Sequence, residues 1–358
     1  MGKKIVTVLG ARPQFIKAAT VSRELKRRGN FKEIIVHTGQ HFDSNMSDIF
    51  FRQMEIPVPD YNLAINGLSH GAMTGKMIAA IEEILLEVKP DWVLVYGDTN
   101  STLAGALAAA KLHINVAHVE AGLRSFNMRM PEEINRILTD RVSTLLFSPT
   151  ETAISNLTRE GFESINHKLI NSGDVMFDAA LFYNEKSLKP ALDIPGKFVL
   201  VTIHRAENTD DSSRLTSIIE ALKEISREIP VVIPLHPRTR KIMEKLNINL
   251  SSNHIHLIEP VGYLEMVYLL NNASLVMTDS GGLQKEAFFF KKPCITLRDE
   301  TEWVELIELG VNSLGGSEMQ RIISLYEESK NKRYNFEVNL YGKGDAAQNI
   351  VKEIEVFA

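Results

Sequence analysis

The chain has very little cysteine and no long apolar run, and both absences narrow the class of protein. Its 358 residues include one cysteine, Cys294, so neither an intrachain disulfide nor a zinc site of paired cysteines can form. The longest apolar runs are short, such as residues 92–96, whereas a membrane-spanning helix needs ~20 residues. The N-terminus also lacks the apolar stretch of a signal peptide, and we therefore expect a cytoplasmic protein.

An excess of positive charge is missing as well. Lysine and arginine number 40 against 45 aspartate and glutamate residues, which gives a net charge of −5. This balance does not indicate a surface for a polyanion, so we expect no nucleic acid and no membrane among the partners. At roughly 100–200 residues per domain, the length predicts two domains.

Short apolar runs alternate with helical patterns along the chain. The predicted strands are residues 5–9, 34–36, 92–96, 115–119, 198–202, 231–234, 255–257, 273–277 and 294–296. Because helical patterns separate these near-continuous apolar runs, they indicate parallel sheets covered on both faces. We predict an α/β fold of two doubly wound, Rossmann-like domains, residues 1–172 and 173–344, with a ligand in the cleft between them. A helix within residues 345–358 is expected to complete the first domain.

Three carboxylates follow predicted strands in the first half. Asp98 comes after residues 92–96, Glu120 comes directly after residues 115–119, and Glu132 begins a helix soon afterwards. Because the carboxyl ends of parallel strands meet at one edge of a sheet, we expect Asp98 and Glu120 to lie close together. Grouped carboxylates can serve as general acids and bases. Taken singly, each is explained more readily by charge or capping at a helix N-terminus.

Residues 278–282 (TDSGG) follow a strand and open a helix in the second half. Free backbone N–H groups at a helix start bind anions, and paired glycines let a phosphate approach closely. Glu286, one turn further along, is placed to accept hydrogen bonds from a ribose. An ordinary helix cap with a glycine turn is the alternative. The sequence has neither a GxGxxG after the first strand nor a P-loop, so a nicotinamide dinucleotide and P-loop chemistry are unsupported.

Several basic side chains also follow predicted strands. His204 and His236 follow consecutive strands of the second half, which suits a diphosphate and a proton transfer. Arg12 follows the first strand and has the planar fork that meets a phosphate. His118 and Glu120 are two residues apart on a strand and so share a face, but no third ligand is evident, and we predict no metal.

Together these segments resemble one family. They are residues 10–17 (GARPQFIK), 96–99 (YGDT), 118–124 (HVEAGLR), 131–136 (PEEINR), 204–205 (HR) and 278–287 (TDSGGLQKEA). In this order they resemble the non-hydrolysing UDP-N-acetylglucosamine 2-epimerases, from residue 4 to about residue 305. The resemblance implies a glycosyltransferase-B-like fold, a homodimer and a role in cell-surface polysaccharide synthesis. It also implies interconversion of UDP-N-acetylglucosamine and UDP-N-acetylmannosamine without an external cofactor.

The family is thought to eliminate UDP across C1–C2 to a 2-acetamidoglucal and to add it back after protonation on the other face. The resemblance implies that Asp98, Glu120 and Glu132 are the acid/base carboxylates and that His204 assists the leaving diphosphate. The other implied substrate contacts are Arg12, Lys17, Arg136, Arg205, His236, Ser280, Gly281, Gly282 and Glu286.

The chain departs from many family members in ways that bear on the substrate. Residues 69–71, 124–127, 204–208 and 302–305 resemble a subgroup that includes epimerases of UDP-2,3-diacetamido-2,3-dideoxyglucuronate, which is the alternative substrate. A uronate needs an extra cation, for which the candidates are Arg124, Arg129 and Arg205.

Two further departures concern regulation and the first loop. Many bacterial members read TRPE where this chain reads ARPQ, residues 11–14. Regulated members carry Arg-Gln where this chain has Gly67 and Leu68, so we predict no strong activation by substrate. A hydrolysing 2-epimerase, a glycosyltransferase of the same fold and a nucleotide-sugar sensor are the remaining alternatives, and the three carboxylates argue against the last two.

Overall fold

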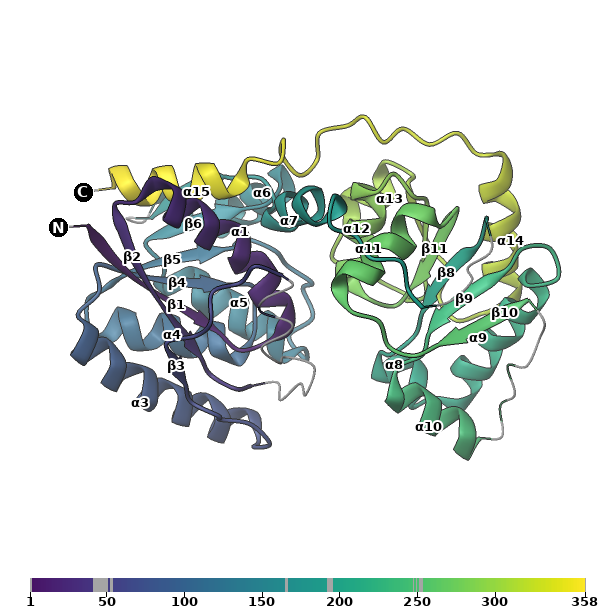
Figure 1. Ribbon diagram of the computed structural model, residues 1–358, viewed down its shortest axis with the longest axis horizontal. Helices are drawn as coiled ribbons and strands as arrows, with labels where there is room; N and C mark the ends of the chain where they lie inside the picture. Colours follow the sequence, from purple (N-terminus) through teal and green to yellow (C-terminus); the bar gives the residue numbers. More distant parts are fainter. Residues whose placement is uncertain are drawn as a thin grey trace. The chain divides into compact units, whose positions relative to one another are not determined.

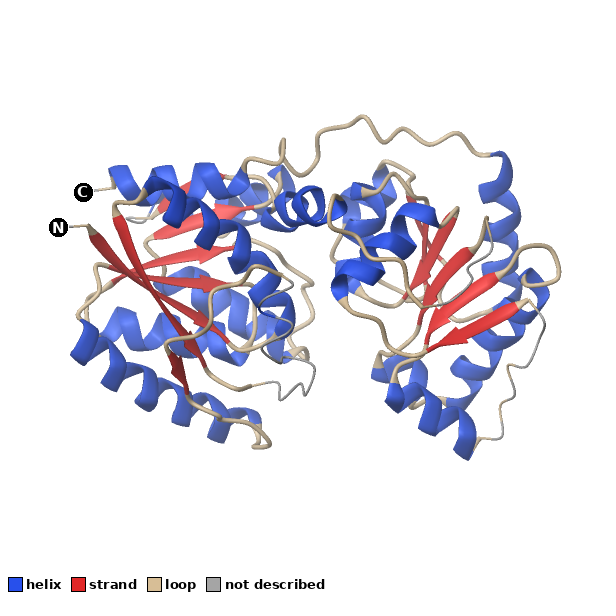
Figure 2. Cartoon of the chain, viewed as in Figure 1, coloured by secondary structure: helices blue, strands red, loops and turns tan. Residues whose placement is uncertain are grey.

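The computed structural model describes residues 2–40, 51, 54–164, 167–191, 196–246, 248, 250 and 254–357. The chain forms two compact units, one of Met1–Ala179 with Asn339–Ala358 and one of Ala180–Val338. Each unit is a parallel sheet with helices on both of its faces (Figures 1 and 2). The predicted α/β architecture of two doubly wound units is therefore confirmed. The predicted boundary at residues 172/173 stays a prediction.

The first unit has a sheet of the Rossmann type. Its described strands lie in the order β3 (Tyr61–Asn62), β2 (Phe31–His37), β1 (Lys3–Leu9), β4 (Trp92–Tyr96), β5 (Asn115–Val119), β6 (Leu145–Ser148) and β7 (Lys168–Asn171). The helical segments are α1 (Arg12–Arg28), α3 (His70–Val88), α4 (Asn100–Lys111), α5 (Pro131–Val142), α6 (Glu151–Arg159), η1 (Phe162–Ser164) and α15 (Ala346–Val356). Helix α7 (Val175–Asn184) begins in this unit and ends in the second.

The order of these strands explains where a ligand can bind. Strand β1 lies between β2 and β4, and the connections that follow β1 and β4 therefore lead in opposite directions along the sheet, to β2 and to β5. Ligands of doubly wound sheets bind at the carboxyl ends of such a pair. The segments that follow β1 and β4 are those that contain Arg12 and Asp98.

The C-terminal helix α15 belongs to the first unit (Figure 1). The Lys3 ammonium donates hydrogen bonds to the carbonyls of Ile354, Glu355 and Phe357 at 2.8–3.0 Å. At the other end of the helix, the Asp178 carboxylate accepts from the backbone N–H groups of Ala346 and Ala347. Both ends of the helix are thus anchored to the first unit by polar contacts.

The second unit repeats the design. Its strands lie in the order β10 (Ile255–Ile258), β9 (Val231–Pro234), β8 (Val199–Thr202), β11 (Leu275–Thr278), β12 (Cys294–Thr296) and β13 (Asn312–Leu314). The helices are α8 (Ala206–Thr209), α9 (Ser212–Ile225), α10 (Pro237–Lys245), α11 (Tyr263–Asn272), α12 (Gly281–Phe289), α13 (Val304–Glu308) and α14 (Met319–Asn331).

Strand β8 shows why the apolar runs of the sequence are continuous. Val199 and Val201 join the core formed with α9 and α14, whereas Leu200 joins the core formed with α11 and α12. Both faces of the strand are therefore buried, as in other parallel sheets. None of the helices in the described part of the chain is long and apolar enough to span a membrane.

Candidate active site

Asp98 and Glu120 leave the first sheet at the same edge. Strands β4 and β5 pair in parallel with Tyr96 opposite Val119, so the residues that follow them are neighbours. Glu120 has a φ of 76°, and its N–H and that of Ala121 both donate to the Phe147 carbonyl. A left-handed conformation costs a residue with a side chain roughly 1–3 kcal/mol. The strained turn at Glu120 is thus held in place by β6.

Each of the two carboxylates has a basic partner. Lys17 of α1 forms an ion pair with Glu120, and Arg136 of α5 forms one with Asp98. Burial raises the pKa of the Asp98 carboxyl; the Arg136 guanidinium opposes that shift, the Glu120 charge adds to it and the Lys17 ammonium opposes it. A raised pKa makes it easier for a carboxyl group to take up the proton that a general acid must donate.

Helix capping does not explain Asp98. The N-cap of α4 is Thr99, whose hydroxyl accepts from the Thr102 N–H. The Asp98 backbone carbonyl is held separately, because the Asn135 side-chain amide donates to it at 2.9 Å. The Asp98 carboxylate thus pairs with Arg136 and does not cap α4, so the capping interpretation of this residue is wrong.

The two glutamates at the start of α5 have different environments. Glu133 is 1 % exposed and accepts hydrogen bonds from Ser125, Phe126 and Arg136. Glu132 is exposed, and within the described residues it has no hydrogen bond or ion pair. Glu133 orders the loop before α5, whereas the catalytic role of Glu132 stays a prediction.

Gln14 joins the loop after β1 to the loop after β4. Its side-chain oxygen accepts from the N–H groups of Gly10 and Ala11, at 2.7 and 3.0 Å. Its side-chain nitrogen donates to the Tyr96 carbonyl at 2.7 Å and to the Thr102 hydroxyl at 2.9 Å. In the sequence, Gln14 stands out only as a departure from the family; in the structure, it fixes the turn that leads into α1 and Arg12.

A buried polar network that the sequence analysis missed lies beneath the two carboxylates. The His118 ring bonds to Asp140 at 2.7 Å and to the Gly97 carbonyl at 2.8 Å. Arg124 contacts Asp140 at 2.8 Å and holds Glu160 through two parallel bonds of 2.7 and 2.8 Å. Arg124 is thus a buried structural cation, and the structure removes it as a candidate for binding a uronate.

The same network includes His118, which with Glu120 has the spacing of possible metal ligands. Both ring nitrogens of His118 face oxygen atoms, so neither is available to a metal. Within the described ranges, no three or more His, Cys, Asp or Glu side chains are grouped to hold an ion.

Asp279 organises the corresponding edge of the second unit. It is completely buried after β11, and its carboxylate accepts from the N–H groups of His204 and Arg205 at 3.0–3.1 Å. The Asn208 side chain donates to the same carboxylate at 3.3 Å. Asp279 therefore joins the loops after β8 and β11. Its place inside the TDSGG segment was the signal that could have identified it.

His204 is partly exposed at this edge. Its Nδ1 lies 3.4 Å from Asp279 Oδ1, and its ring centroid is 6.3 Å from that of His236. Partial desolvation lowers the pKa of His204; Asp279 opposes this shift, and Arg205 and His236 add to it. An anion arriving beside the ring would raise that pKa again. His236 itself caps α10 by accepting from the Arg238 N–H.

The predicted anion-binding loop, residues 278–282, leads into α12, and its two glycines have different surroundings. Ser280 is the N-cap, and its side chain makes no capping hydrogen bond. A Cβ atom at Gly281 would overlap the Glu302 carboxylate, whereas at Gly282 it would meet no atom within 4 Å. Glu286, on the same helix, is 7 % exposed. The loop thus presents an open helix start at Gly282, as an anion site requires.

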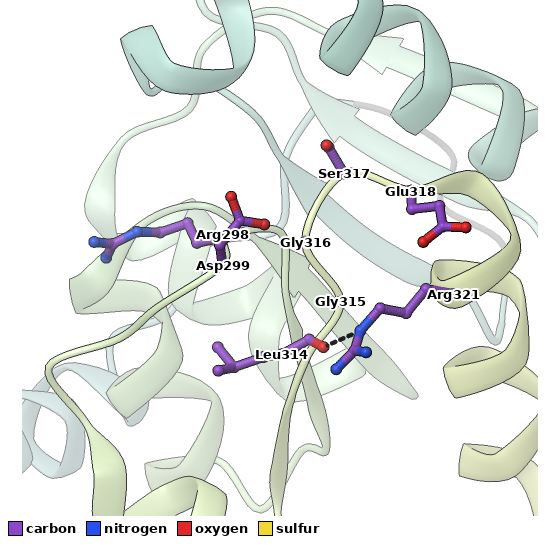
Figure 3. A pocket seen from close by; sticks show the side chains of 8 residues that line it. All are labelled: Arg298, Asp299, Leu314, Gly315, Gly316, Ser317, Glu318 and Arg321. Carbon is purple, nitrogen blue, oxygen red and sulfur yellow. Dashed lines mark hydrogen bonds between the residues drawn. The ribbon is translucent and has the colours of Figure 1, made fainter.

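A cavity of about 330 Å³ opens at the carboxyl ends of β12 and β13. Figure 3 shows its lining, which consists of Arg298, Asp299, Leu314, Gly315, Gly316, Ser317, Glu318 and Arg321. The Arg321 Nε donates to the Leu314 carbonyl at 2.8 Å. Because β11, β12 and β13 are parallel neighbours, the cavity and the anion-binding loop share one edge of the sheet.

Residues 23–355 match a family model described as UDP-N-acetylglucosamine 2-epimerase. The chain belongs to this family. It is a UDP-sugar 2-epimerase, an isomerase. It is 58 % identical to the Pseudomonas aeruginosa protein named UDP-2,3-diacetamido-2,3-dideoxy-D-glucuronate 2-epimerase, over 98 % of each chain. It is 46 % identical to the Methanocaldococcus jannaschii UDP-N-acetylglucosamine 2-epimerase, also over 98 % of each chain.

Solved structures support the fold of this epimerase. The M. jannaschii enzyme in complex with UDP-GlcNAc and UDP superposes with a TM-score of 0.86 at 43 % identity, covering 99 % of this chain and 100 % of that one. Acinetobacter baumannii MurG, at 14 % identity and a TM-score of 0.59, shares the fold alone, over 99 % of this chain and 100 % of its own. The glycosyltransferase-B-like architecture is thus confirmed.

The predicted site residues of the epimerase fall into one group in each unit. The first unit brings together Asp98, Glu120, Lys17 and Arg136 through ion pairs and shared charge. The second unit brings together His204, Arg205 and His236 around Asp279, and it places Ser280, Gly281, Gly282 and Glu286 at the start of α12. Arg12 lies in the first turn of α1.

Proposed function

We propose that this epimerase interconverts the C2 epimers of UDP-2,3-diacetamido-2,3-dideoxyglucuronate. The observation that carries the choice of sugar is the 58 % identity to the P. aeruginosa enzyme of that name. The M. jannaschii UDP-N-acetylglucosamine 2-epimerase is less similar, at 46 %. UDP-N-acetylglucosamine, with UDP-N-acetylmannosamine as product, is the second candidate, because the family model and the ligand-bound structure carry its name.

The proposed chemistry uses the two carboxylates of the first unit. One of Asp98 and Glu120 removes the C2 proton, and the electron pair of the C2–H bond forms a double bond between C1 and C2. The C1–O bond breaks at the same time, and UDP leaves with the electron pair of that bond. Protonation of the opposite face of C2 and return of UDP to C1 complete the epimerisation. The raised pKa of Asp98 supports this role, because its carboxyl can hold a proton between the two half-reactions. Glu132 is the third proposed carboxylate.

In this mechanism the second unit is proposed to bind the leaving UDP. Negative charge accumulates on the diphosphate as C1–O breaks, so fixed donors there stabilise the transition state more than the ground state. The start of α12 supplies backbone N–H groups, and His204 can take up a proton as the anion raises its lowered pKa. Arg12 and Lys17 are proposed to contact the phosphates, and Glu286 the ribose.

The uronate carboxylate needs a cation that is accessible. With Arg124 buried against Asp140 and Glu160, we propose that Arg129 or Arg205 supplies it. Arg129 is exposed in the loop before α5, and Arg205 is partly exposed beside His204. Replacing the correct arginine by methionine should raise KM for the uronate sugar and leave KM for UDP-N-acetylglucosamine unchanged.

We further propose that the enzyme is a cytoplasmic homodimer that serves cell-surface polysaccharide synthesis. The exposed apolar surface of α5 and its preceding loop supports a dimer. Phe126 and Met128 are 75 % and 60 % exposed, and Ile134 and Leu138 are 40 % and 43 % exposed. Residues four apart share one face of a helix, so this surface is continuous on α5.

Proton NMR in deuterated water tests the reaction and the sugar together. Incubation with the diacetamido-glucuronate sugar should place deuterium at C2 and produce a manno-configured UDP-sugar, faster than with UDP-N-acetylglucosamine. Faster conversion of UDP-N-acetylglucosamine would reverse the choice of sugar. Free UDP with free sugar would identify a hydrolysing enzyme instead.

Three variants test the carboxylate assignment. Asp98→Asn, Glu120→Gln and Glu132→Gln should lower turnover by orders of magnitude while UDP still binds. Glu87→Gln, which changes a carboxylate elsewhere in the first unit, is the control. Near-normal turnover in all three site variants would refute the assignment.

A further inference from the structure

His118 is completely buried in β5, and its two ring nitrogens both face oxygen atoms. Nδ1 lies 2.7 Å from an oxygen of Asp140, and Nε2 lies 2.8 Å from the Gly97 carbonyl. A peptide carbonyl accepts hydrogen bonds and never donates them. Nε2 therefore carries a proton that it donates to Gly97.

The Asp140 carboxylate has other donors of its own. Arg124 contacts it at 2.8 Å, and the Gly122 N–H donates to it at 3.2 Å. Hydrogen bonds and a cation favour the ionised form of a carboxyl group. An ionised Asp140 leaves Nδ1 of His118 as the donor in their contact, so the ring carries a proton on each nitrogen.

The two glycines in this network flank the proposed catalytic carboxylates. Gly97, with a φ of 63°, directly precedes Asp98, and Gly122, with a φ of 81°, follows Glu120 by two residues. Both conformations favour glycine, so the turns have no side chains of their own to hold them. The His118 ring holds the carbonyl of the first turn, and Asp140 holds the N–H of the second.

Charge balance accounts for a charged ring in this buried place. Two cations, His118 and Arg124, alternate with two anions, Asp140 and Glu160. A buried charge is tolerated when it is paired and hydrogen-bonded, and it is costly once a partner is removed. A neutral ring would have a lone pair on one nitrogen, facing either the Gly97 carbonyl or the Asp140 carboxylate. The two lone pairs would repel each other, and the turn held through that contact would be released.

We infer that His118 is a buried imidazolium that positions Asp98 and Glu120 through the turns at Gly97 and Gly122. The protonation state is a property of the fold, whereas the effect on catalysis rests on the proposed function of the two carboxylates. His118 is thus a positioning residue that touches no substrate.

Nitrogen-15 NMR of the unaltered enzyme tests the protonation state directly. Both His118 nitrogens should resonate in the protonated range at neutral pH and should couple to attached protons. His37 is the comparison within the same spectrum, because burial lowers its pKa and it should show one bare nitrogen. His118→Gln and His37→Gln assign the two rings, and correlations to the β5 backbone do so where a variant does not fold. A bare nitrogen on His118 at neutral pH would overturn the inference.

Kinetics of matched variants test the positioning role. In His118→Gln and Asp140→Asn, kcat should fall roughly 100-fold, since a displacement of about 1 Å costs that much. The Kd for UDP should change far less than kcat, because the proposed UDP contacts at α12 lie in the other unit and only Arg12 and Lys17 lie in the first. His37→Gln, at the end of β2, controls for loss of a half-buried histidine of the same unit and should keep its kcat.

Rescue and a comparison of variants separate the possible failures. Added imidazole should restore part of the turnover of His118→Ala, an effect that general destabilisation would not produce. Normal kcat in folded His118→Gln, together with inactive Asp98→Asn and Glu120→Gln, would refute the positioning role alone. Active Asp98→Asn and Glu120→Gln would refute the proposed function instead, while the nitrogen signals of His118 would still decide its charge.

Discussion

Lys17 and Glu120 form an ion pair at the carboxyl edge of the first sheet, although 103 positions separate them in the chain. Their side chains are only 14 % and 10 % exposed. Lys17 comes from α1 and Glu120 from the strained turn after β5. The lysine therefore balances a carboxylate charge that would otherwise act on Asp98, a role that its assignment as a phosphate ligand did not include.

Replacing Lys17 by methionine should change the pH dependence of catalysis. The Lys17 charge lowers the pKa of Asp98 and so opposes the effect of burial. In Lys17→Met the pKa of Asp98 should rise, and the limb of the kcat/KM profile that reports it should move to higher pH. Lys26→Met, exposed at the end of α1, is the control. A limb that stays in place would contradict the electrostatic coupling.

Gln14→Glu should destabilise the first unit by about 1–3 kcal/mol, the usual cost of leaving a buried polar group unpaired. A carboxylate cannot donate to the Tyr96 carbonyl or the Thr102 hydroxyl, which the Gln14 amide now does. Urea unfolding measures the loss. Gln320→Glu, exposed on α14, makes the same chemical change and should be neutral. Equal stability of the two variants would mean that the Gln14 bonds contribute nothing.

Alanine at Gly281 and at Gly282 should have different effects. Gly281→Ala forces a new Cβ against Glu302, which Arg298 holds at 3.0 Å, so the melting temperature should fall. Gly282→Ala meets open space and should leave melting unchanged. If a phosphate sits against Gly282, this second variant should raise the Kd for UDP by roughly tenfold, or about 1.4 kcal/mol. Unchanged UDP binding by calorimetry would place the phosphate elsewhere.

Asp178 should make the anchoring of α15 dependent on pH. Burial raises the pKa of its carboxyl from 3.8 to about 6, despite the two N–H groups of α15 that it accepts. Between these values the folded state binds the extra proton, so the free energy of unfolding falls as pH rises through this window. Asp178→Asn abolishes this effect and should gain stability relative to the wild type from pH 4 to pH 7. A constant difference in urea unfolding across that range would contradict the shift.

The apolar surface of α5 should control the oligomeric state. Ile134→Lys and Leu138→Lys each place a charge on the face proposed for the dimer, and sedimentation velocity should then show a monomer. Leu257→Lys is the matched control, because Leu257 is 39 % exposed and lies in the second unit. A wild-type monomer, or dimers of both α5 variants, would refute this interface.

The fold class was predictable because its signal is local. The continuous apolar run of residues 92–96 and the largely apolar run of residues 115–119 appear as β4 and β5 with the same bounds, since a strand buried on both faces is rich in apolar residues. The edge that carries Asp98 and Glu120 follows from the same pattern. The TDSGG segment marked the position of Asp279, but the contacts of Asp279 and His118 were not predictable, because each bonds to a loop from a different part of the chain.

The sequence by itself determined the alternation of strands and helices, the polar segments at the strand ends and the family to which they belong. Only the tertiary structure decided which of these polar groups are paired inside the fold and which lie at the edge proposed for catalysis. In the fold, Arg124 is buried against Glu160, Glu133 accepts a hydrogen bond from Ser125 of the loop before α5, and Thr99 rather than Asp98 caps α4. The reason is physical: a side chain's pairing depends on which distant loops the order of the strands brings beside it, and no local pattern of residues encodes that order.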